Sequence, residues 1–176
     1  RSAFRAMTTG RPGATHICLP YDVQKHMLDP ADVWAQPGHD HYPAYRSAPD
    51  PAAVAEAADR LVAARCPVLI CGGGVLIAGA SAALDALATL LNAPVCSSVS
   101  GQGSLAGSHP LNAGVVGTNG GVEATRAVVA QADLVMFIGA RAGSTTTEHW
   151  QMPSRKVTIV HLDAVSYTHL RAHETL

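Results

Sequence analysis

The sequence predicts an α/β protein with a doubly wound, Rossmann-like parallel sheet, and three observations indicate this fold class. From residue 51 onward, short apolar runs typical of buried strands alternate with segments of helical periodicity. The connections between them are short, as in βαβ units. Glycine or polar residues follow the end of each apolar run, where ligands bind in open parallel sheets.

The first helix is expected over residues 51–65. Asp50 is a good N-cap residue, and Pro51 suits the first helical position. The apolar face of this helix is predicted to consist of Val54, Ala58, Leu61 and Val62. A second helix is expected over residues 81–91, with Leu84, Leu87, Leu90 and Leu91 facing inward. Residues 122–131 form the third expected helix.

The expected strands of the sheet cover residues 67–71, 94–98, 133–138 and 157–162. The segment 99–114 between the second and third of these regions is rich in Gly and Ser, so we expect a long loop there. No internal repeat is present. This order of strands and helices places helices on both faces of the sheet.

The first fifty residues have a different character. Residues 14–19 (ATHICL) resemble a short strand between a Gly-Arg-Pro-Gly turn and Pro20. Residues 21–50 hold several prolines and no hydrophobic period, which indicates a linker. His39, Asp40 and His41 within it could bind a metal ion, but solvated side chains in a polar loop are the better interpretation.

Composition excludes several classes of function. The chain is 48% hydrophobic with a formal net charge of −1, which gives no reason to expect a nucleic-acid or anionic-membrane partner. No apolar run is long enough to cross a bilayer, and no signal peptide is present. The four cysteines form no Cys-x-x-Cys pair, so we expect free, buried thiols in a reducing cytoplasm.

The residues that could carry chemistry follow the predicted strands. Glycines 72–74 follow the first strand, Gly139 and Arg141 the third, and Asp163 the fourth. Such glycines allow phosphates to approach backbone amides, and a terminal acidic residue can bind a ribose. The spacing lacks the GxGxxG fingerprint, so a tight structural turn explains the triple glycine equally well. No nucleophile and base stand together. The residues alone indicate a nucleotide-binding-like domain.

Two stretches resemble a known family, the thiamine-diphosphate-dependent enzymes of the acetolactate-synthase-like class. Residues 3–23 (AFRAMTTGRPGATHICLPYDV) are similar to the closing segment of that family's N-terminal, pyrimidine-binding domain. Residues 67–163 are similar to its central domain, with PVLICGGGV, GVVGTNGG, ADLVMFIGAR and IVHLD in matching order and spacing. The resemblance therefore implies three regions: residues 1–23 end the N-terminal domain, 24–50 form a linker, and 51–164 form an incomplete central domain.

The resemblance also implies the cofactors. Thiamine diphosphate and Mg²⁺ would be bound by domains outside this chain, so it implies no catalytic residue and no metal ligand here. In related branches the central domain binds FAD or ADP. Carried over by position, the cofactor-binding candidates are Gly72, Gly73, Gly74, Ser98, Ser100, Gly117, Thr118, Asn119, Gly139, Arg141 and Asp163. Residues 142–145 depart from the Phe-Asp-Asp-Arg usual in the synthase branch, so an unliganded structural domain is the alternative.

The resemblance implies a parent enzyme, a transferase or lyase, that acts on a 2-keto acid and forms a homodimer or homotetramer. The rival hypothesis is a stand-alone module that binds FAD, ADP or NAD without catalysis. It accounts for the glycines and for Asp163. It does not account for residues 14–19, which resemble the last strand of another domain and would have no sheet to join.

The two ends of the sequence suggest a fragment. The chain starts at Arg1, and residues 165–176 (VSYTHLRAHETL) do not continue the preceding pattern. This string resembles one reading frame of a common transposase-based sequencing-library adapter. We therefore expect it to be a library scar and leave it out of the fold and the site. A fragment of this kind is expected to have no thiamine-dependent turnover of its own.

Overall fold

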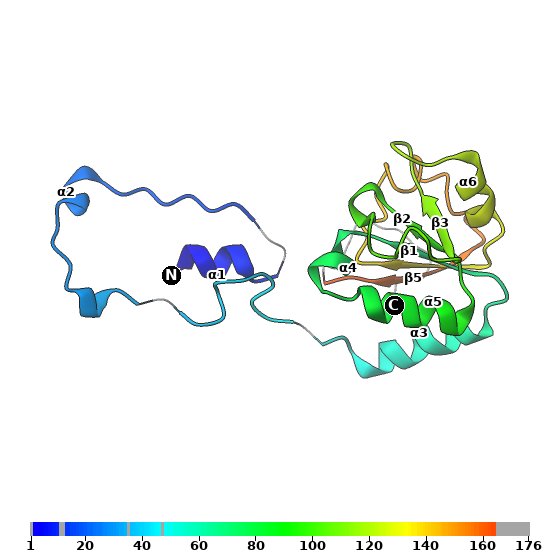
Figure 1. The fold of residues 1–176 in the computed structure, drawn as a ribbon, viewed down its shortest axis with the longest axis horizontal. Helices are drawn as coiled ribbons and strands as arrows, with labels where there is room; N and C mark the ends of the chain where they lie inside the picture. The colour runs from blue at the N-terminus through cyan, green and yellow to red at the C-terminus, as the bar shows by residue number, and fades with distance from the viewer. Residues whose placement is uncertain (1, 11–12, 35, 47, 165–176) are drawn as a thin grey trace. The chain divides into compact units, whose positions relative to one another are not determined.

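The computed structural model describes residues 2–10, 13–34, 36–46 and 48–164. The chain divides into two compact units, residues 1–48 and residues 49–176, each of which is described by itself (Figure 1). The expected adapter-derived residues 165–176 lie outside the described residues.

The second unit is built on a five-stranded, wholly parallel sheet, so the predicted fold class is confirmed. Its strands are β1 (Pro67–Cys71), β2 (Val95–Ser97), β3 (Asn112–Val115), β4 (Leu134–Ile138) and β5 (Thr158–Leu162). Their spatial order is β3-β2-β1-β4-β5. Strand β3 was missed, because residues 112–115 (NAGV) hold two small residues and no β-branched run. Pairing with β2 makes this segment a strand.

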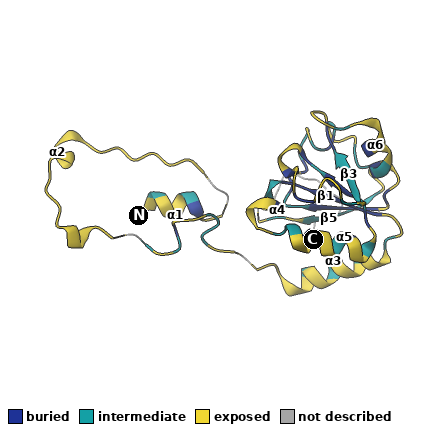
Figure 2. Ribbon diagram, in the orientation of Figure 1, coloured by how far each residue is buried: buried dark blue, intermediate teal, exposed yellow. Residues whose placement is uncertain are grey.

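Helices cover both faces of this sheet. Leu61 of α3 (Pro51–Ala63) and Leu84 of α5 (Ser81–Leu91) pack with Leu69 on one face. Val129 of α6 (Glu123–Ala130) packs with Val68 and Phe137 on the other face. Two shorter helices, α4 (Gly73–Ile77) and the 3₁₀ turn η2 (Val99–Gly101), follow β1 and β2. The central strands β1 and β4 are almost wholly buried, whereas the edge strands β3 and β5 are mostly intermediate (Figure 2).

Helix α3 begins as predicted, but it packs on a different face. The Asp50 side chain accepts a hydrogen bond from the Ala52 N–H at 2.9 Å, which confirms the N-cap. Of the four residues predicted to face inward only Leu61 is buried, and it packs together with Ala57 and Ala64. Val54, Ala58 and Val62 are exposed. The predicted face and the face that packs on the sheet are both apolar in this alanine-rich helix. Periodicity alone therefore could not show which of the two faces the core.

The prediction for α5 was wrong at one position. Leu84 is buried and Leu87 and Leu91 are partly buried, but the Leu90 side chain is 82% exposed. Leu90 lies one residue before the end of the helix, where the chain turns at Asn92 in the left-handed conformation.

The first unit contains little regular structure. Its elements are α1 (Ser2–Thr8), α2 (Tyr21–Gln24) and the 3₁₀ turn η1 (Pro30–Asp32). The predicted strand over residues 14–19 is absent: this segment is exposed and has no strand assignment. A strand needs a neighbour to accept its backbone hydrogen bonds, and the described part of this unit supplies none.

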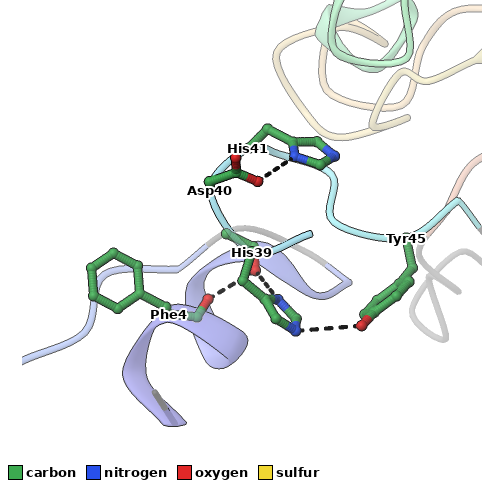
Figure 3. A network of polar contacts seen from close by, with 6 residues as sticks. Phe4, His39, Asp40, His41 and Tyr45 are labelled. Carbon is green, nitrogen blue, oxygen red and sulfur yellow. Dashed lines mark hydrogen bonds and ion pairs between the residues drawn. The ribbon is translucent and has the colours of Figure 1, made fainter. Parts of the chain in front are cut away.

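A polar cluster around His39 ties residues 36–45 to α1 (Figure 3). The Thr8 hydroxyl donates to the Phe4 carbonyl at 2.8 Å, and the His39 Nδ1 lies 2.8 Å from the same hydroxyl oxygen. Because Thr8 has a single hydroxyl proton, Nδ1 is the donor in this second bond. Tyr45 then donates to His39 Nε2 at 3.5 Å. The expected solvated side chain is wrong for His39, which is only 4% exposed.

Asp40 and His41 behave as expected and remain exposed. Their side chains form a hydrogen bond at 2.9 Å, and this bond from His41 lowers the pKa of Asp40. Within the described residues, no three His, Cys, Asp or Glu side chains gather as a metal ion would require.

Candidate site at the carboxyl edge of the sheet

The carboxyl edge of the sheet contains the topological switch point of this fold. The strand order runs from β1 toward β2 and β3 on one side and toward β4 and β5 on the other. The crevice between the ends of β1 and β4 is therefore where a doubly wound sheet usually binds its ligand. Gly72 follows β1, and Gly139 follows β4.

Backbone contacts close this crevice. The Gly72 N–H donates to the Ile138 carbonyl at 2.9 Å, and the Gly74 N–H donates to the Gly139 carbonyl at 3.0 Å. A Cβ atom on Gly72 would lie 2.3 Å from the Gly139 oxygen, and one on Gly74 would lie 2.7 Å from the Gly139 Cα. These glycines are required by the close approach of two backbones, which gives them a structural reason independent of any ligand.

The end of β2 joins the same cluster. The Ser98 N–H donates to the Cys71 carbonyl at 2.8 Å, and the Ser98 and Ser100 hydroxyls lie 3.3 Å apart. A Cβ atom on Gly73 would lie 3.2 Å from the backbone carbonyl oxygen of Ser100. The predicted residues after β1, β2 and β4 are therefore brought together at the edge of the sheet.

The turn that contains Gly117, Thr118 and Asn119 meets a second loop. The Thr118 N–H donates to the Thr145 carbonyl at 2.9 Å, and a Cβ atom on Gly117 would lie 2.3 Å from the same oxygen. The Thr118 and Asn119 side chains are exposed and lie 3.3 Å apart. The backbone of this turn is thus covered, while its polar side chains face solvent.

Arg141 and Asp163 differ in their surroundings. Arg141 is exposed, and its side chain lies beside Gly143. The Asp163 carboxylate is largely buried and lies 3.9 Å from His161 Nε2. The same nitrogen donates to the Ala140 carbonyl at 2.9 Å, so His161 connects the end of β5 to the segment after β4.

Cys71 and Cys96 beneath this edge are chemically quiet. Burial raises the pKa of the Cys71 thiol, and it raises the pKa of Cys96 to about 12. The Cys71 thiol donates to the Cys96 carbonyl at 3.2 Å. Cys18 and Cys66, which we expected to be buried, are exposed, so that prediction holds for only two of the four thiols.

The resemblance places Mg²⁺ and thiamine diphosphate outside this chain, and FAD or ADP at this edge. Mg²⁺ with a diphosphate prefers several oxygen ligands, and the described residues include no metal-binding cluster. At Gly72, Gly74 and Gly139, backbone of the facing turn occupies the position that a Cβ atom would take. No step of a reaction is therefore assigned to a cofactor at this edge.

A cavity of about 310 Å³ opens at the opposite, amino edge of the sheet. Its lining comes from the segments before β1 and β2 and from the ends of α5 and α6, and includes Arg65, Cys66, Asn92 and Gln131. None of the predicted site residues lies there. Because ligands of this fold bind at the carboxyl edge, we regard this cavity as a surface concavity.

Sequence reasoning missed two polar arrangements. The Asp133 carboxylate accepts the N–H groups of Arg65 at 2.7 Å and Cys66 at 2.9 Å, and these bonds lower the pKa of Asp133. Arg126 binds both carboxylate oxygens of Glu148. The first pair is 68 residues apart and the second 22 residues apart, so no local pattern marked either.

The fold and the closed glycine turns define a class of α/β domain with a doubly wound parallel sheet. The chain belongs to a particular family within it, because the family model described as "Thiamine pyrophosphate enzyme, central domain" matches residues 54–174. The resemblance stated from the sequence is thereby confirmed.

Known proteins agree with this membership. The chain is 35% identical over 165 residues to a Methanocaldococcus jannaschii protein named "Probable acetolactate synthase large subunit". This match covers 93% of this chain and 28% of that protein. It is 32% identical to a glyoxylate carboligase of Escherichia coli O157:H7, over 93% of this chain and 27% of that protein.

A solved structure shows the same fold. It comes from Mycobacterium smegmatis and is described as that of a thiamin diphosphate-dependent enzyme; the TM-score is 0.69 and the identity 27%, over 91% of this chain and 30% of that chain. The chain thus spans between a quarter and a third of the length of the proteins that it matches.

Proposed function

We propose that this chain is part of a thiamine-diphosphate-dependent enzyme that acts on 2-keto acids, in the manner of an acetolactate synthase or a related carboligase. The observation that carries the proposal is the family match to residues 54–174, together with the fold it describes. Thiamine diphosphate, when bound by such an enzyme, serves as an electron sink for the carbanion formed from the substrate.

The extent of the sequence match supports this proposal over a stand-alone nucleotide-binding module. A match over 93% of a 176-residue chain takes in residues 14–50 as well as the sheet unit. A module without catalysis would need no segment similar to an enzyme's preceding domain. The match of residues 14–23, the expected end of that preceding domain, therefore favours the enzyme.

The role that we propose for the sheet unit is structural. Its residues bury a core on both faces of the sheet and close the edge between β1 and β4 with backbone contacts. Such a domain supports and spaces the domains that bind thiamine diphosphate and magnesium. Binding of FAD or ADP stays a prediction for all of the candidate residues: Gly72, Gly73, Gly74, Ser98, Ser100, Gly117, Thr118, Asn119, Gly139, Arg141 and Asp163.

The setting of the enzyme is also a proposal. We propose a cytoplasmic homodimer or homotetramer of transferase or lyase activity. The four cysteines are free, which suits a reducing compartment. No helix in the described part of the chain is long and apolar enough to cross a bilayer.

The proposal is tested by comparing two proteins. The gene is resequenced in its source DNA, and the full reading frame is expressed beside the 176-residue chain. With thiamine diphosphate and Mg²⁺ added, we expect the full protein to consume pyruvate or glyoxylate and the 176-residue chain to show no turnover. Turnover by the short chain would contradict its assignment as a non-catalytic part, and an inactive, well-folded full protein that binds no thiamine diphosphate would refute the proposed function.

A further inference from the structure

Three consecutive residues near the carboxyl edge adopt the left-handed backbone conformation. Glu148, His149 and Trp150 have φ values of 49°, 59° and 60°. Each non-glycine residue in this region costs free energy, and consecutive ones are rare. Such a run persists only where surrounding contacts hold it, and strained residues of this kind cluster at active sites, ligand clamps and switch regions.

Most of the contacts that hold this turn come from its own segment. The His149 N–H donates to the Ser144 carbonyl at 2.7 Å, and the Ser144 hydroxyl lies 2.8 Å from His149 Nδ1. The Thr147 hydroxyl donates to the Gly143 carbonyl at 2.9 Å and accepts the Trp150 N–H at 3.0 Å. These bonds fix the shape of residues 144–151, which we name the strap.

A side chain of α6 anchors the strap from outside. Arg126 Nε donates to Glu148 Oε1 at 2.7 Å and to Oε2 at 2.9 Å. The Glu148 side chain is only 14% exposed, so this charge-assisted bond is partly shielded from water. Loss of Arg126 would leave a poorly solvated carboxylate in a strained turn.

The strap covers the turn of residues 117–121. Thr145 accepts the Thr118 N–H, and the Gly117 Cα faces the Thr145 carbonyl. A Cβ atom on Gly121 would lie 3.2 Å from Glu148 Oε1. In this position the strap closes off the backbone of the turn at the carboxyl edge.

We propose that the strap has a closed and an open position, and that the Arg126–Glu148 ion pair is the lock that keeps it closed against its strained backbone. Opening relaxes Glu148, His149 and Trp150 and uncovers the turn of residues 117–121. The lock thus controls access to one part of the carboxyl edge. This inference does not depend on which reaction the enzyme catalyses.

Cleavage of the 176-residue chain by a Glu-specific protease tests the lock. The protease cleaves after Glu148 itself, so the rate of this cleavage reports how often the strap opens. In Arg126→Gln we expect cleavage after Glu148 to accelerate at least about tenfold, since partial opening of a held segment sets the rate of its proteolysis. The matched control is Arg60→Gln, which removes an ion pair of similar length, 2.9 Å to Glu56, within α3. Cleavage after Glu148 should be unchanged in the control.

A second variant tests the role of strain. Trp150→Gly removes an exposed side chain and relieves one left-handed residue. Added to Arg126→Gln, it should slow cleavage after Glu148 again, because the closed position becomes less costly. Faster cleavage in the double variant would overturn the strain argument.

The remaining outcomes also decide the matter. Equal cleavage after Glu148 in Arg126→Gln and Arg60→Gln would show a rigid surface loop and overturn the proposal. If Arg126→Gln loses its native circular dichroism, Arg126→Lys takes its place, because it keeps the charge but not the Nε contact. An intermediate rate of cleavage in Arg126→Lys is expected, because Lys keeps the charge but loses the Nε contact to both Glu148 oxygens. A rate equal to that of the wild type would overturn this Nε contact as the lock.

Discussion

The two units of this chain use apolar residues in opposite ways. In the sheet unit, large side chains such as Leu69, Ile70 and Phe137 are fully buried between two helical layers. In the N-terminal unit, Ile17, Leu19 and Met27 are exposed, and the fixed part depends on a few polar bonds around His39. Figure 2 shows the contrast directly. The sheet unit therefore buries its large apolar side chains in a core. The N-terminal unit has apolar side chains of the same kind but leaves them exposed.

Thiol reactivity should separate the two kinds of environment most strongly. Cys71 and Cys96 lie in the core, and burial raises the pKa of Cys96 to about 12 from a usual value of 9.0. A shift of this size lowers the thiolate fraction about a thousandfold at neutral pH. We expect a thiol reagent at pH 8 to label Cys18 and Cys66 in seconds to minutes and to leave Cys71 and Cys96 unlabelled.

Mass spectrometry of labelled peptides measures this difference. All four cysteines should react at similar rates in denaturant, which serves as the control. Rapid labelling of Cys96 under native conditions would mean that the core of the sheet unit opens readily, and the contrast between the units would fail.

The glycine contacts at the carboxyl edge should give the largest effect of a single substitution on stability. In Gly139→Ala, the new methyl group would lie 2.8 Å from the Gly74 backbone, and the residue would keep a φ of 54°. We expect the free energy of unfolding in urea to fall by about 3 kcal/mol. Gly79→Ala is the control: φ is 63° but the site is open, so we expect a loss of about 1 kcal/mol. Equal losses would show that backbone conformation alone, not close approach, requires glycine at position 139.

The polar cluster of the N-terminal unit should respond on a smaller scale. Thr8→Val would leave the His39 Nδ1–H without its acceptor in a buried site. The loss of about 1.4 kcal/mol should speed hydrogen exchange of the Ala44 amide, which donates to the Thr8 carbonyl, about tenfold. Thr15→Val, at an exposed position, is the matched control. Amides of β1 and β4 should be unchanged in both variants; faster exchange there in Thr8→Val would mean that the two units are coupled.

The sequence predicted the sheet well because its strands and helices carry local signals. Four strands, the three longer helices of the sheet unit and the Asp50 cap follow from apolar runs, periodicity and capping chemistry. The failures share one cause, which is tertiary context. Strand β3 exists because β2 pairs with it, and residues 14–19 form no strand because the described chain gives them no neighbour.

The candidate site divides in the same way. Glycines 72–74 and Gly139 were found because glycine after a strand is a local signal. Their mutual packing could not be predicted, since it depends on the close approach of two loops 65 or more residues apart in sequence. The Arg126–Glu148 pair and the Asp133 bonds to Arg65 and Cys66 likewise join segments that only the folded sheet unit brings together.

Asp133 provides the smallest of these effects, and it makes the stability of the fold depend on pH. Its carboxylate accepts two backbone N–H groups at the start of β1, and these bonds lower the pKa of Asp133 below its usual value of 3.8. Since the folded pKa lies below the unfolded one, the carboxylate stabilises the fold above about pH 4 and loses this contribution as the pH falls through the folded pKa.

Asp133→Asn should lower Tm slightly between pH 6 and pH 8, and the difference from the wild type should shrink below about pH 4. Asp59→Asn, which changes an exposed carboxylate of α3, should show no such trend. A Tm difference for Asp133→Asn that is the same at pH 3 and pH 7 would mean that the side chain acts through its shape rather than its charge. The segment before β1 would then not depend on an ionised Asp133 carboxylate.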